Sequence, residues 1–387
     1  MTTLKSLYPR LSAYYFFHFA ALGALMPYWG PYLDHLGFSE ERIGILFALL
    51  LGTKIIAPNL WGWIADQRGQ RIGMIRAGAL LAMLCFAGLL LGNSFWLIAL
   101  VMLGFGFFWN AILPQFEANT LNHLGSRDNR YSLVRVWGSV GFILAVVGLG
   151  AWLEDHSIEH LPAIVLVIIA GILIVTLLVP EGPKQSHHET RQSAFTLLKD
   201  ARVWSLFLCF FLMQASHGPY YSFFSLFLER NGYGPSLIGW LWALGVIAEI
   251  GVFLAMPRLL PRFGARRLLL FAFGATTVRW LMIAAFVDKL PVILLAQTLH
   301  LASFGIYHAI AVHFVHRYFT GQLQGRGQAL YSSLGFGAGG AAGSLVAGFL
   351  WNSVSPASIF VAAAGMSFVA LLIAARGVED IGRSNEP

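Results

Sequence analysis

Apolar segments of about 20 residues, the length that a helix needs to cross the hydrocarbon core of a bilayer, recur along this whole chain. Of the residues, 57% are hydrophobic and 11% are charged, whereas about 25% are charged in a typical soluble domain. The sequence therefore predicts an all-α integral membrane protein with twelve transmembrane helices. Their boundaries are expected near residues 11–33, 43–61, 74–92, 96–121, 132–153, 161–179, 203–228, 236–256, 268–287, 291–316, 328–350 and 357–375.

The basic residues lie mainly in short loops on one side of the predicted membrane, as Arg71, Arg266 and Arg317 do. Loops on the opposite side are rich in acids, such as Glu41 and Glu154. Lys and Arg accumulate in cytoplasmic loops, so both termini are predicted to be cytoplasmic, in a bacterial inner membrane. Because the basic residues of these loops account for the net charge of +7, no nucleic-acid partner is predicted.

The predicted spans form two sets of six, which gives an N-terminal bundle at 1–180 and a C-terminal bundle at 203–387. The longest polar stretch, 181–202, lies between them and is predicted to be a cytoplasmic linker. The two halves repeat with an offset of 195 residues, which is one of the known plans of transporters. Matching positions are Gly37 with Gly232, Lys54 with Glu249, Gly69 with Gly264 and Arg71 with Arg266.

Five ionisable residues lie inside the predicted spans: Lys54, Glu117, Arg135, Glu249 and Arg279. Each charged group costs roughly 2.5–3.5 kcal/mol near the bilayer centre, so such residues normally face a polar interior and serve function. Three bases against two acids favour an anionic substrate, or a neutral one carried with a proton. The structural alternative, which is compatible with this, is that they form buried ion pairs between helices.

The sequence also predicts partners for the two acids. Glu117 and Arg135 lie nine residues either side of Ser126 in a short loop, so a helical hairpin places them at similar depth. Glu249 and Arg279 lie fifteen residues either side of Gly264. We therefore expect each acid to pair with the base of its own hairpin, and all four to converge on one polar cavity.

Histidines also fall within the spans, among them His18, His217, His300 and His308. A single histidine in such a place is more often a hydrogen-bonded core residue than a functional one. His300 is the best candidate for a titrating or substrate-contacting group, and its spacing of seven residues predicts that Tyr307 shares its helix face. The histidines lack metal-ligand spacing, and Cys85 and Cys209 lie within spans, so neither a metal site nor a disulfide is predicted.

The first predicted cytoplasmic loop resembles the signature loop of the major facilitator superfamily. Its residues are Gly62, Asp66, Arg68, Gly69 and Arg71. An acid at a helix end beside a glycine turn and basic residues can bridge helices and hold one conformation closed, which predicts a role in gating. The alternative is a basic loop that only anchors topology.

A closer resemblance follows from Phe116-Glu117-Ala118, with Arg135-Val-Trp137-Gly-Ser eighteen residues later. These residues resemble the proton-coupled oligosaccharide permeases of the lactose permease type. His217 with Tyr220-Tyr221, and the run from Leu241 to Glu249, are more similar to the phenylpropionate permease branch of the superfamily. The resemblance covers the whole chain and implies two six-helix bundles, alternating access and proton symport.

By position, the resemblance also implies roles for individual residues. Glu117 and Arg135 would bind substrate, while Glu249, Arg279 and His300 would take part in coupling. The full set of residues that we predict to bind substrate is Glu117, Arg135, Lys54, Trp137, His217, Tyr221 and His300. The set predicted for proton coupling is Glu117, Glu249, Arg279 and His300. The sequence departs from the lactose permease pattern at Ser303, where that family has the proton-carrying glutamate. Which residue carries the proton is therefore left open between Glu117, Glu249 and His300.

The predicted function is proton-coupled symport of a small organic substrate, with an aromatic carboxylic acid such as 3-phenylpropionate as the first expectation. Arg135 or Lys54 would hold the carboxylate. A sugar or nucleoside symporter is the alternative, and a non-transporting membrane sensor a further one. An enzyme is not predicted, since the spans contain neither a Gly-x-Ser-x-Gly elbow nor a His-Glu-x-x-His motif. The expected partners are a small-molecule substrate and membrane lipid, and the chain is expected to be a monomer. The proton is the expected coupling ion, and no other cofactor is predicted. Import and export remain alternatives for the direction of transport.

Overall fold

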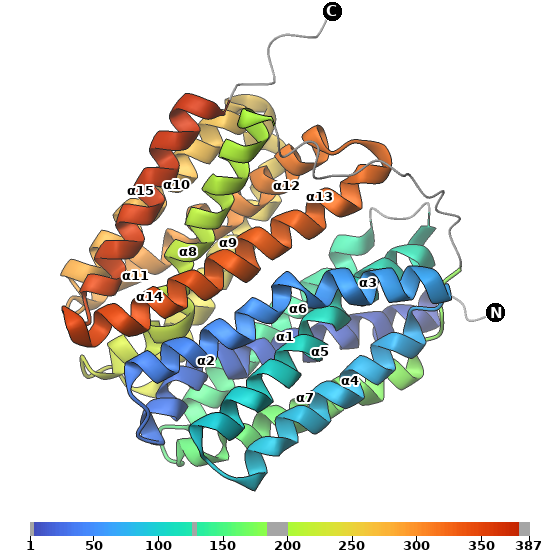
Figure 1. Cartoon of the computed structure of the whole chain (residues 1–387), viewed down its shortest axis with the longest axis horizontal. Coiled ribbons are helices and arrows are strands. Elements are labelled where there is room, and N and C mark those ends of the chain that lie inside the picture. Colours follow the sequence, from blue (N-terminus) through green and yellow to red (C-terminus); the bar gives the residue numbers. More distant parts are fainter. Residues whose placement is uncertain (1–3, 126–129, 184–199, 379–387) are drawn as a thin grey trace, which may run out of the picture. The chain divides into compact units, whose positions relative to one another are not determined.

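The computed structural model describes residues 4–125, 130–183 and 200–378, and helices are the only regular elements in these residues (Figure 1). They divide into two compact units. Unit 1 comprises the described residues up to 183 together with Gly232–Trp240, and unit 2 comprises 200–231 and the described residues from Leu241 onward. Most of the predicted linker and the loop around Ser126 lie outside the described residues.

Unit 1 is a bundle in which α1 packs against α6 and α7, and α4 packs against α5. Its elements are α1 (Leu4–His35), α2 (Glu40–Gly52), the 3-10 turn η1 (Thr53–Ile55), α3 (Ala57–Arg68), α4 (Ile72–Ala87), η2 (Gly88–Leu91), α5 (Phe95–Leu124), α6 (Tyr131–Trp152), η4 (Ile158–His160) and α7 (Leu161–Leu178).

Unit 2 packs α8 against α14 and α15, and α10 against α15. Its elements are α8 (Ala201–Glu229), α9 (Pro235–Phe263), α10 (Ala265–Ala285), α11 (Leu290–Thr298), η6 (Leu301–Ile306), α12 (Tyr307–Tyr318), η7 (Gly321–Leu323), α13 (Gln324–Tyr331), η8 (Ser332–Gly339), α14 (Gly340–Ser353) and α15 (Ser358–Gly377). The segments η6 and η8 are π-helical, and the first turns of α9 belong to unit 1.

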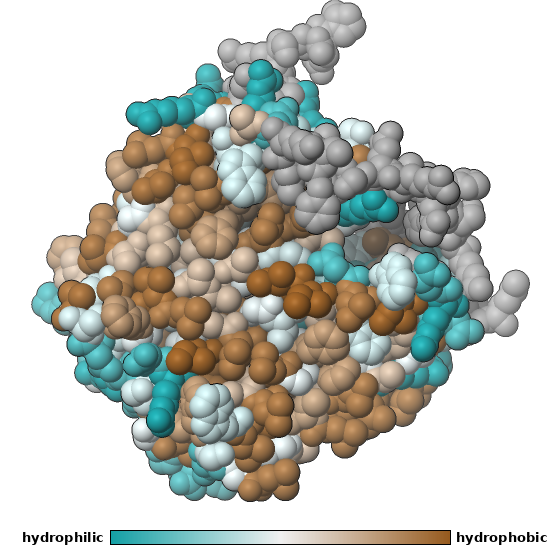
Figure 2. Space-filling view, viewed as in Figure 1, coloured by the Kyte–Doolittle hydropathy of each residue, from teal (hydrophilic) through white to brown (hydrophobic). Residues whose placement is uncertain are grey.

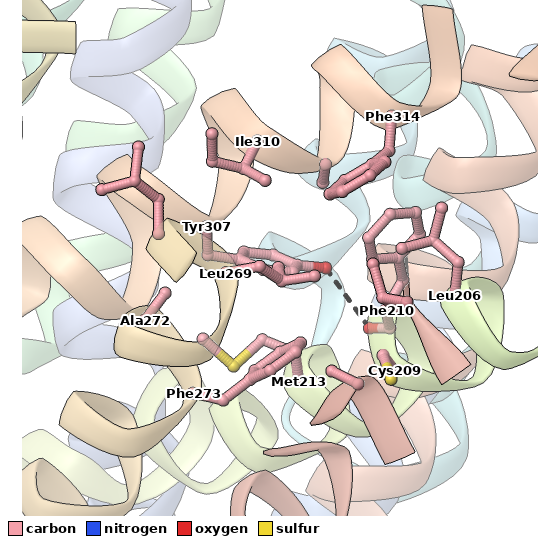
Figure 3. Close-up of a cluster of buried hydrophobic side chains, with 14 of the residues drawn as sticks. Leu206, Cys209, Phe210, Met213, Leu269, Ala272, Phe273, Tyr307, Ile310 and Phe314 are labelled. Carbon is pink, nitrogen blue, oxygen red and sulfur yellow. Dashed lines mark hydrogen bonds between the residues drawn. The ribbon is translucent and has the colours of Figure 1, made fainter. Parts of the chain in front are cut away.

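A large apolar core in unit 2 joins α8, α10 and α12, with Phe210, Phe273 and Phe314 among its side chains (Figure 3). Tyr307 lies in this core, and its hydroxyl donates a hydrogen bond to the carbonyl oxygen of Phe210 at 3.4 Å. Burial of the phenol therefore leaves its polar atom satisfied, as a buried hydroxyl requires.

The helices agree with the predicted fold class and with the twelve predicted spans. Ten helical segments of the described chain are long and apolar enough to cross a membrane. The two others, α1 and α8, have 32 and 29 residues and carry more polar side chains. The buried polar residues of these two helices include Ser12, His18, Gln214, Ser216 and His217. In a membrane protein such side chains point to the bundle interior, so α1 and α8 are where polar function is expected.

The outer surface of both units is apolar, and Figure 2 shows hydrophobic side chains over much of the visible face. Large aliphatic and aromatic residues are exposed along the helices, among them Leu100, Leu144, Val167, Leu254 and Phe349. Apolar surface of this extent is a liability in water but is the ordinary covering of a protein in lipid.

Close helix packing repeats between the halves. In unit 1, a Cβ at Gly141 of α6 would lie 2.2 Å from the carbonyl oxygen of Phe16 on α1. In unit 2, a Cβ at Gly343 of α14 would lie 2.0 Å from the carbonyl oxygen of Ala215 on α8. Both pairs join the first and fifth spans of their half, and glycine lets these backbones touch, as small residues do between membrane helices.

The 195-residue offset also holds for helix ends. The paired helices begin at Glu40 and Pro235 and end at Arg68 and Phe263. All four landmark glycines have positive φ: 81° at Gly37, 85° at Gly232, 62° at Gly69 and 79° at Gly264. Glycine adopts these angles at little cost, which explains why it recurs at these turns.

The repeat is broken around Lys54. In unit 1 the helix is interrupted there by η1, whereas α9 runs without a break through the matching Glu249. Pro58 lies four residues after Lys54, and a proline cannot donate to the carbonyl four residues before it. The interruption therefore follows from a local sequence feature, and it places Lys54 in a short 3-10 turn.

Candidate functional site

Unit 1 gathers the three predicted charged residues, Lys54 of η1, Glu117 of α5 and Arg135 of α6. Glu117 accepts a hydrogen bond at 3.1 Å from the hydroxyl of Tyr131, the first residue of α6. Arg135 follows Tyr131 by one helical turn, and both Arg135 and Lys54 act electrostatically on the Glu117 carboxylate. We call Lys54, Glu117, Tyr131 and Arg135 the N-terminal cluster. The direct Glu117–Arg135 ion pair that the hairpin predicts is not formed between these two described residues, and the hydrogen bond to the Glu117 carboxylate comes from Tyr131 instead.

The Arg135 guanidinium rests on aromatic rings of α1. Its central carbon lies 3.9 Å from the centroid of Phe19 and 5.6 Å from that of Tyr15. Among the described residues it has no hydrogen-bond or ion-pair partner. A Cβ at Gly138 would lie only 2.7 Å from its Nη1, so this glycine of the Arg-x-Trp-Gly motif leaves room for the guanidinium. Arg135 is thus held by its faces, while its edge donors stay available for an acidic group.

Beside this cluster, four rings form a continuous stack between α1 and α5. His18 lies 4.2 Å from Trp109 at an interplanar angle of 9°, and 5.6 Å from Tyr14 at 21°. Tyr14 in turn stacks on Phe116 at 3.4 Å and 12°. We call Tyr14, His18, Trp109 and Phe116 the aromatic stack. Tyr14 interacts electrostatically with Glu117, and His18 with Arg135 and Lys54, so the stack lies close to the N-terminal cluster.

Unit 2 holds the other charged residues around Arg279 of α10, which is completely buried. Its Nε donates to the carbonyl oxygen of Ala296 at 3.0 Å, its Nη1 to Ser303 Oγ at 2.8 Å and its Nη2 to Gln297 Oε1 at 3.1 Å. The central carbon of its guanidinium lies 4.4 Å from the centroid of the Tyr220 ring and 4.5 Å from that of the Trp280 ring. A buried charge needs this degree of hydrogen bonding, and little of Arg279 is left for a ligand.

His300 connects Arg279 to Glu249. Its Nδ1 lies 3.0 Å from Arg279 Nη1, and its Nε2 lies 3.6 Å from Glu249 Oε2. A guanidinium can only donate, so Nδ1 accepts, and a neutral His300 carries its proton on Nε2, facing the carboxylate. We call Glu249, Arg279, His300 and Ser303 the C-terminal cluster. The predicted direct pair of Glu249 with Arg279 is wrong in this respect, since the imidazole lies between them.

His217 and the tyrosines of α8 adjoin this cluster. The His217 ring lies 6.5 Å from His300, 5.1 Å from Trp280 and 5.9 Å from Tyr221. Its Nδ1 donates to the carbonyl oxygen of Met213 at 2.8 Å, which leaves the lone pair on Nε2, a buried atom with no hydrogen-bond partner among the described residues. His217 therefore offers an acceptor to a ligand.

The π-helical segment η6 sets the direction of these side chains. His300 immediately precedes it, and Ser303 lies within it. His300 stacks on Phe304 at 5.5 Å, whereas Tyr307 points into the apolar core beside Phe210. The expectation that His300 and Tyr307 share a face is wrong, because a π-helix has more residues per turn than the α-helix that the spacing assumes.

Trp137 is not brought into either cluster. Its indole Nε1 donates to the hydroxyl of Tyr8 at 3.2 Å, and 42% of the residue is exposed. Two residues along a helix are about 200° apart, so Trp137 and Arg135 face different ways. The structure therefore gives no support to the predicted contact of Trp137 with substrate.

The predicted gating segment spans the end of α3 and the start of α4. Arg71 donates through Nη1 to Gln115 Oε1, and its backbone N–H donates to Glu181 Oε1 at 2.9 Å. The N–H of Ile72 donates to Glu181 Oε2 at 2.8 Å, so this carboxylate caps the N-terminus of α4. Arg68 ends α3 and Gly69 forms the turn, while Gly62 lies against Gln115. The Asp66 side chain lies outside the described part, and its gating role stays a prediction.

Several residues around the clusters escaped sequence reasoning. Tyr131 and Gln297 are neither charged nor part of a motif, and their role depends on which helix lies opposite. Glu181 lies in the stretch that reads as linker. Ser303 could have been found from the sequence, because it occupies the position where permeases of the lactose permease type have a glutamate. Among the described residues, no three His, Cys, Asp or Glu side chains group as a metal site.

Comparisons with known proteins identify the family and the fold. A family model described as "MFS_1 like family" matches residues 8–362. Over 368 residues the chain is 31% identical to the probable 3-phenylpropionic acid transporter of Escherichia coli (strain K12), covering 92% of this chain and 93% of the relative. It is 29% identical over 350 residues to the maltose permease of Geobacillus stearothermophilus, covering 89% and 87%. The crystal structure of the nucleoside transporter NupG matches with a TM-score of 0.83 and 19% identity, covering 96% of this chain and 99% of that one, which shows a shared fold.

Proposed function

The chain belongs to the MFS_1 like family of membrane transporters, and from this premise we propose that it is a proton-coupled symporter of a small aromatic carboxylic acid. The family match confirms the resemblance to the major facilitator superfamily and to its phenylpropionate branch. Transport of a small molecule across a membrane follows from that membership. The coupling ion and the substrate are our proposal, argued from the two clusters.

The contact of Glu249 with His300 carries the argument for proton coupling. Arg279 donates to Nδ1 of His300 at 3.0 Å, so the imidazole presents an N–H to Glu249 Oε2 at 3.6 Å. This N–H favours the ionised carboxylate, and protonation of Glu249 removes that attraction. A site with two electrostatic states, which differ by one proton, is what a symporter requires. Since Ser303 replaces the family's acid, Glu249 is the carboxylate to which we assign the proton.

The cycle that we propose uses alternating access. Glu249 is protonated from the outside, the substrate binds, and the two bundles move relative to each other so that the site opens inward. Loss of the proton to the cytoplasm restores the Glu249–His300 contact, and the substrate leaves. That both clusters face one substrate pathway stays a prediction. Import is the direction that an inward proton gradient drives.

A carboxylate substrate is supported by Arg135. Its guanidinium carbon lies over the rings of Phe19 and Tyr15, while its donors have no hydrogen-bond partner among the described residues. A guanidinium in this state is suited to bidentate contact with a carboxylate. The N-terminal cluster also holds two bases and one acid, so one anionic substrate balances its charge. The relative at 31% identity is named for 3-phenylpropionic acid.

A sugar or nucleoside symporter is the second candidate. Glu117 uses one carboxylate oxygen for Tyr131, and its other oxygen is suited to accept a hydrogen bond from a substrate hydroxyl. The maltose permease at 29% identity favours this alternative. Neutral substrates would then rely on Arg135 as a donor rather than as a charge.

We further propose that the protein is a monomer in a bacterial inner membrane, surrounded by lipid, with both termini in the cytoplasm. The distribution of basic residues at the helix ends supports this orientation, as at Arg71, Arg266 and Arg317.

Proton uptake by proteoliposomes tests the proposal as a whole. The purified protein is reconstituted and exposed in turn to 3-phenylpropionate, maltose and uridine, and alkalinisation of the weakly buffered external solution is recorded. Uptake of protons with 3-phenylpropionate only is the expected result. Proton uptake with maltose or uridine instead would favour the second candidate, and transport without any proton flux would remove the coupling.

A further inference from the structure

His18 and Tyr14 on α1 are polar residues that neither cluster uses. His18 is 2% exposed and Tyr14 is completely buried. The Nδ1 of His18 and the hydroxyl of Tyr14 have no hydrogen-bond partner among the described residues. Leaving a buried polar atom without a partner costs about 1–3 kcal/mol, so two of them on adjacent turns of one helix require an explanation.

The aromatic stack fixes both side chains so that only their edges can interact. The His18 ring stacks on Trp109 with a centroid distance of 4.2 Å and on Tyr14 with a centroid distance of 5.6 Å. Phe116 covers Tyr14 at 3.4 Å. A ring that is held by stacking loses little further freedom when its edge forms a hydrogen bond, so the two residues are preorganised for a ligand.

The charges next to these edges indicate what the ligand is. His18 lies within electrostatic range of Arg135 and Lys54, and Tyr14 within range of Glu117. With the phenol and a neutral imidazole, this region therefore offers two cations, a hydroxyl donor and an N–H donor, against one carboxylate. Its surplus positive charge and its donors match an oxyanion with several acceptor lone pairs.

We propose that His18 and Tyr14 bind the carboxylate of the transported substrate beside Arg135, the imidazole donating from Nδ1 and the phenol from its hydroxyl. The proposal rests on the carboxylate substrate of the proposed function and adds two recognition residues to it. Trp109 and Phe116 act as positioning residues, because they hold the two rings without touching the substrate.

Paired substitutions separate this role from a structural one. In His18→Phe the aromatic stack is kept and the nitrogens are lost, whereas in His18→Gln the ring is lost and a hydrogen-bond donor is kept. Tyr14→Phe removes only the hydroxyl. His156 provides the control, because its ring also stacks on an indole, that of Trp152 at 4.1 Å and 11°, but at an exposed position after the end of α6.

Equilibrium binding of radiolabelled 3-phenylpropionate to the purified full chain is the measurement, with the unfolding midpoint without ligand as the check on folding. We expect His18→Phe and Tyr14→Phe each to raise the Kd about tenfold or more, the loss of one hydrogen bond to a charged group. We expect His18→Gln to bind more tightly than His18→Phe, and His156→Phe to bind as the wild type does.

Two results would overturn the proposal while the proposed function stands: wild-type affinity in His18→Phe and Tyr14→Phe, or an equal loss in His18→Phe and His18→Gln. If His18→Phe fails to fold, Tyr14→Phe and His18→Gln decide alone, and tighter binding by Tyr14→Phe than by wild type counts against the proposal. A wild-type protein that binds uridine or maltose but not 3-phenylpropionate overturns this proposal and the carboxylate substrate together.

Discussion

Arg135 and Arg279 are both arginines inside membrane-spanning helices, yet their donors are used in opposite ways. The guanidinium of Arg279 donates hydrogen bonds to Ala296, His300, Gln297 and Ser303. Arg135 lies over the rings of Phe19 and Tyr15, and its donors have no hydrogen-bond partner among the described residues. The first arrangement suits a residue that fixes a neighbouring imidazole, and the second suits a residue that binds an anion.

Glu249→Gln tests the proton assignment. Glutamine is close in shape but cannot ionise, so we expect exchange of substrate across the membrane to continue while uphill accumulation fails. Counterflow and pH-gradient-driven uptake in the same proteoliposome preparation distinguish the two. Accumulation with the wild-type pH dependence would exclude Glu249 from the coupling pathway.

Gly138→Ala tests how the guanidinium of Arg135 is accommodated. The new Cβ would lie 2.7 Å from Nη1 and 2.8 Å from the ring of Phe19, so Arg135 must shift. We expect affinity for 3-phenylpropionate to fall on the order of tenfold, as expected when a charged hydrogen bond is misplaced. Gly148→Ala on the same helix is the control, because nothing lies within 4 Å of its added Cβ. Equal affinities of the two variants would contradict this account.

At the scale of helices, the two halves share their turns but differ in their interruptions. Pro58 and η1 break the second span of unit 1, whereas unit 2 carries the π-helical segments η6 and η8. π-helical segments are frequent at functional sites, and η6 aims Ser303 at Arg279. Related halves therefore acquire different chemistry through irregularities within helices that otherwise correspond.

The repeated glycine turns predict a paired effect on stability. Gly69 has φ 62° and ψ 21°, so alanine there should cost about 1 kcal/mol. Gly264 has φ 79° and ψ 154°, a region almost restricted to glycine, so Gly264→Ala should cost more. We expect the thermal unfolding midpoint in detergent to fall for both variants, and to fall further for Gly264→Ala than for Gly69→Ala.

The comparison variant for these turns is Gly274→Ala in the interior of α10, where an added Cβ meets nothing within 4 Å. The unfolding midpoint of Gly274→Ala should equal or exceed that of the wild type, because alanine stabilises a helix by up to about 1 kcal/mol relative to glycine. A fall equal to that of Gly264→Ala would show that backbone conformation is not the cause.

At the scale of the whole molecule, each unit has its own packed helices and its own polar cluster. The proposed orientation in the membrane is predicted from the basic loops and can be measured. We expect a fluorescent protein fused after residue 387 to fluoresce and alkaline phosphatase fused there to be inactive, since both report a cytoplasmic end. Phosphatase fused after Lys289 should be active. The reverse pattern would invert the predicted topology.

The sequence alone determined the class of fold and the positions of the spans. Segments such as 96–121 and 161–179 must form membrane helices, because their apolar length leaves a chain in lipid no other way to satisfy its backbone. The repeat was visible because the turns at Gly37, Gly69, Gly232 and Gly264 have positive φ angles, which favour glycine at the same position of each half. Glu117, Arg135, Glu249 and Arg279 were found because charge inside an apolar span is costly.

Only the tertiary structure decided how these charges are partnered. Hairpin symmetry paired Glu117 with Arg135 and Glu249 with Arg279, but the partners found are Tyr131 and His300. A neutral tyrosine on a facing helix leaves no mark in a sequence, and the π-helical turn at Ser303 changes side-chain directions without changing composition. Hydrogen-bond partners are set by distances of about 3 Å between helices, which spacing along one chain does not contain.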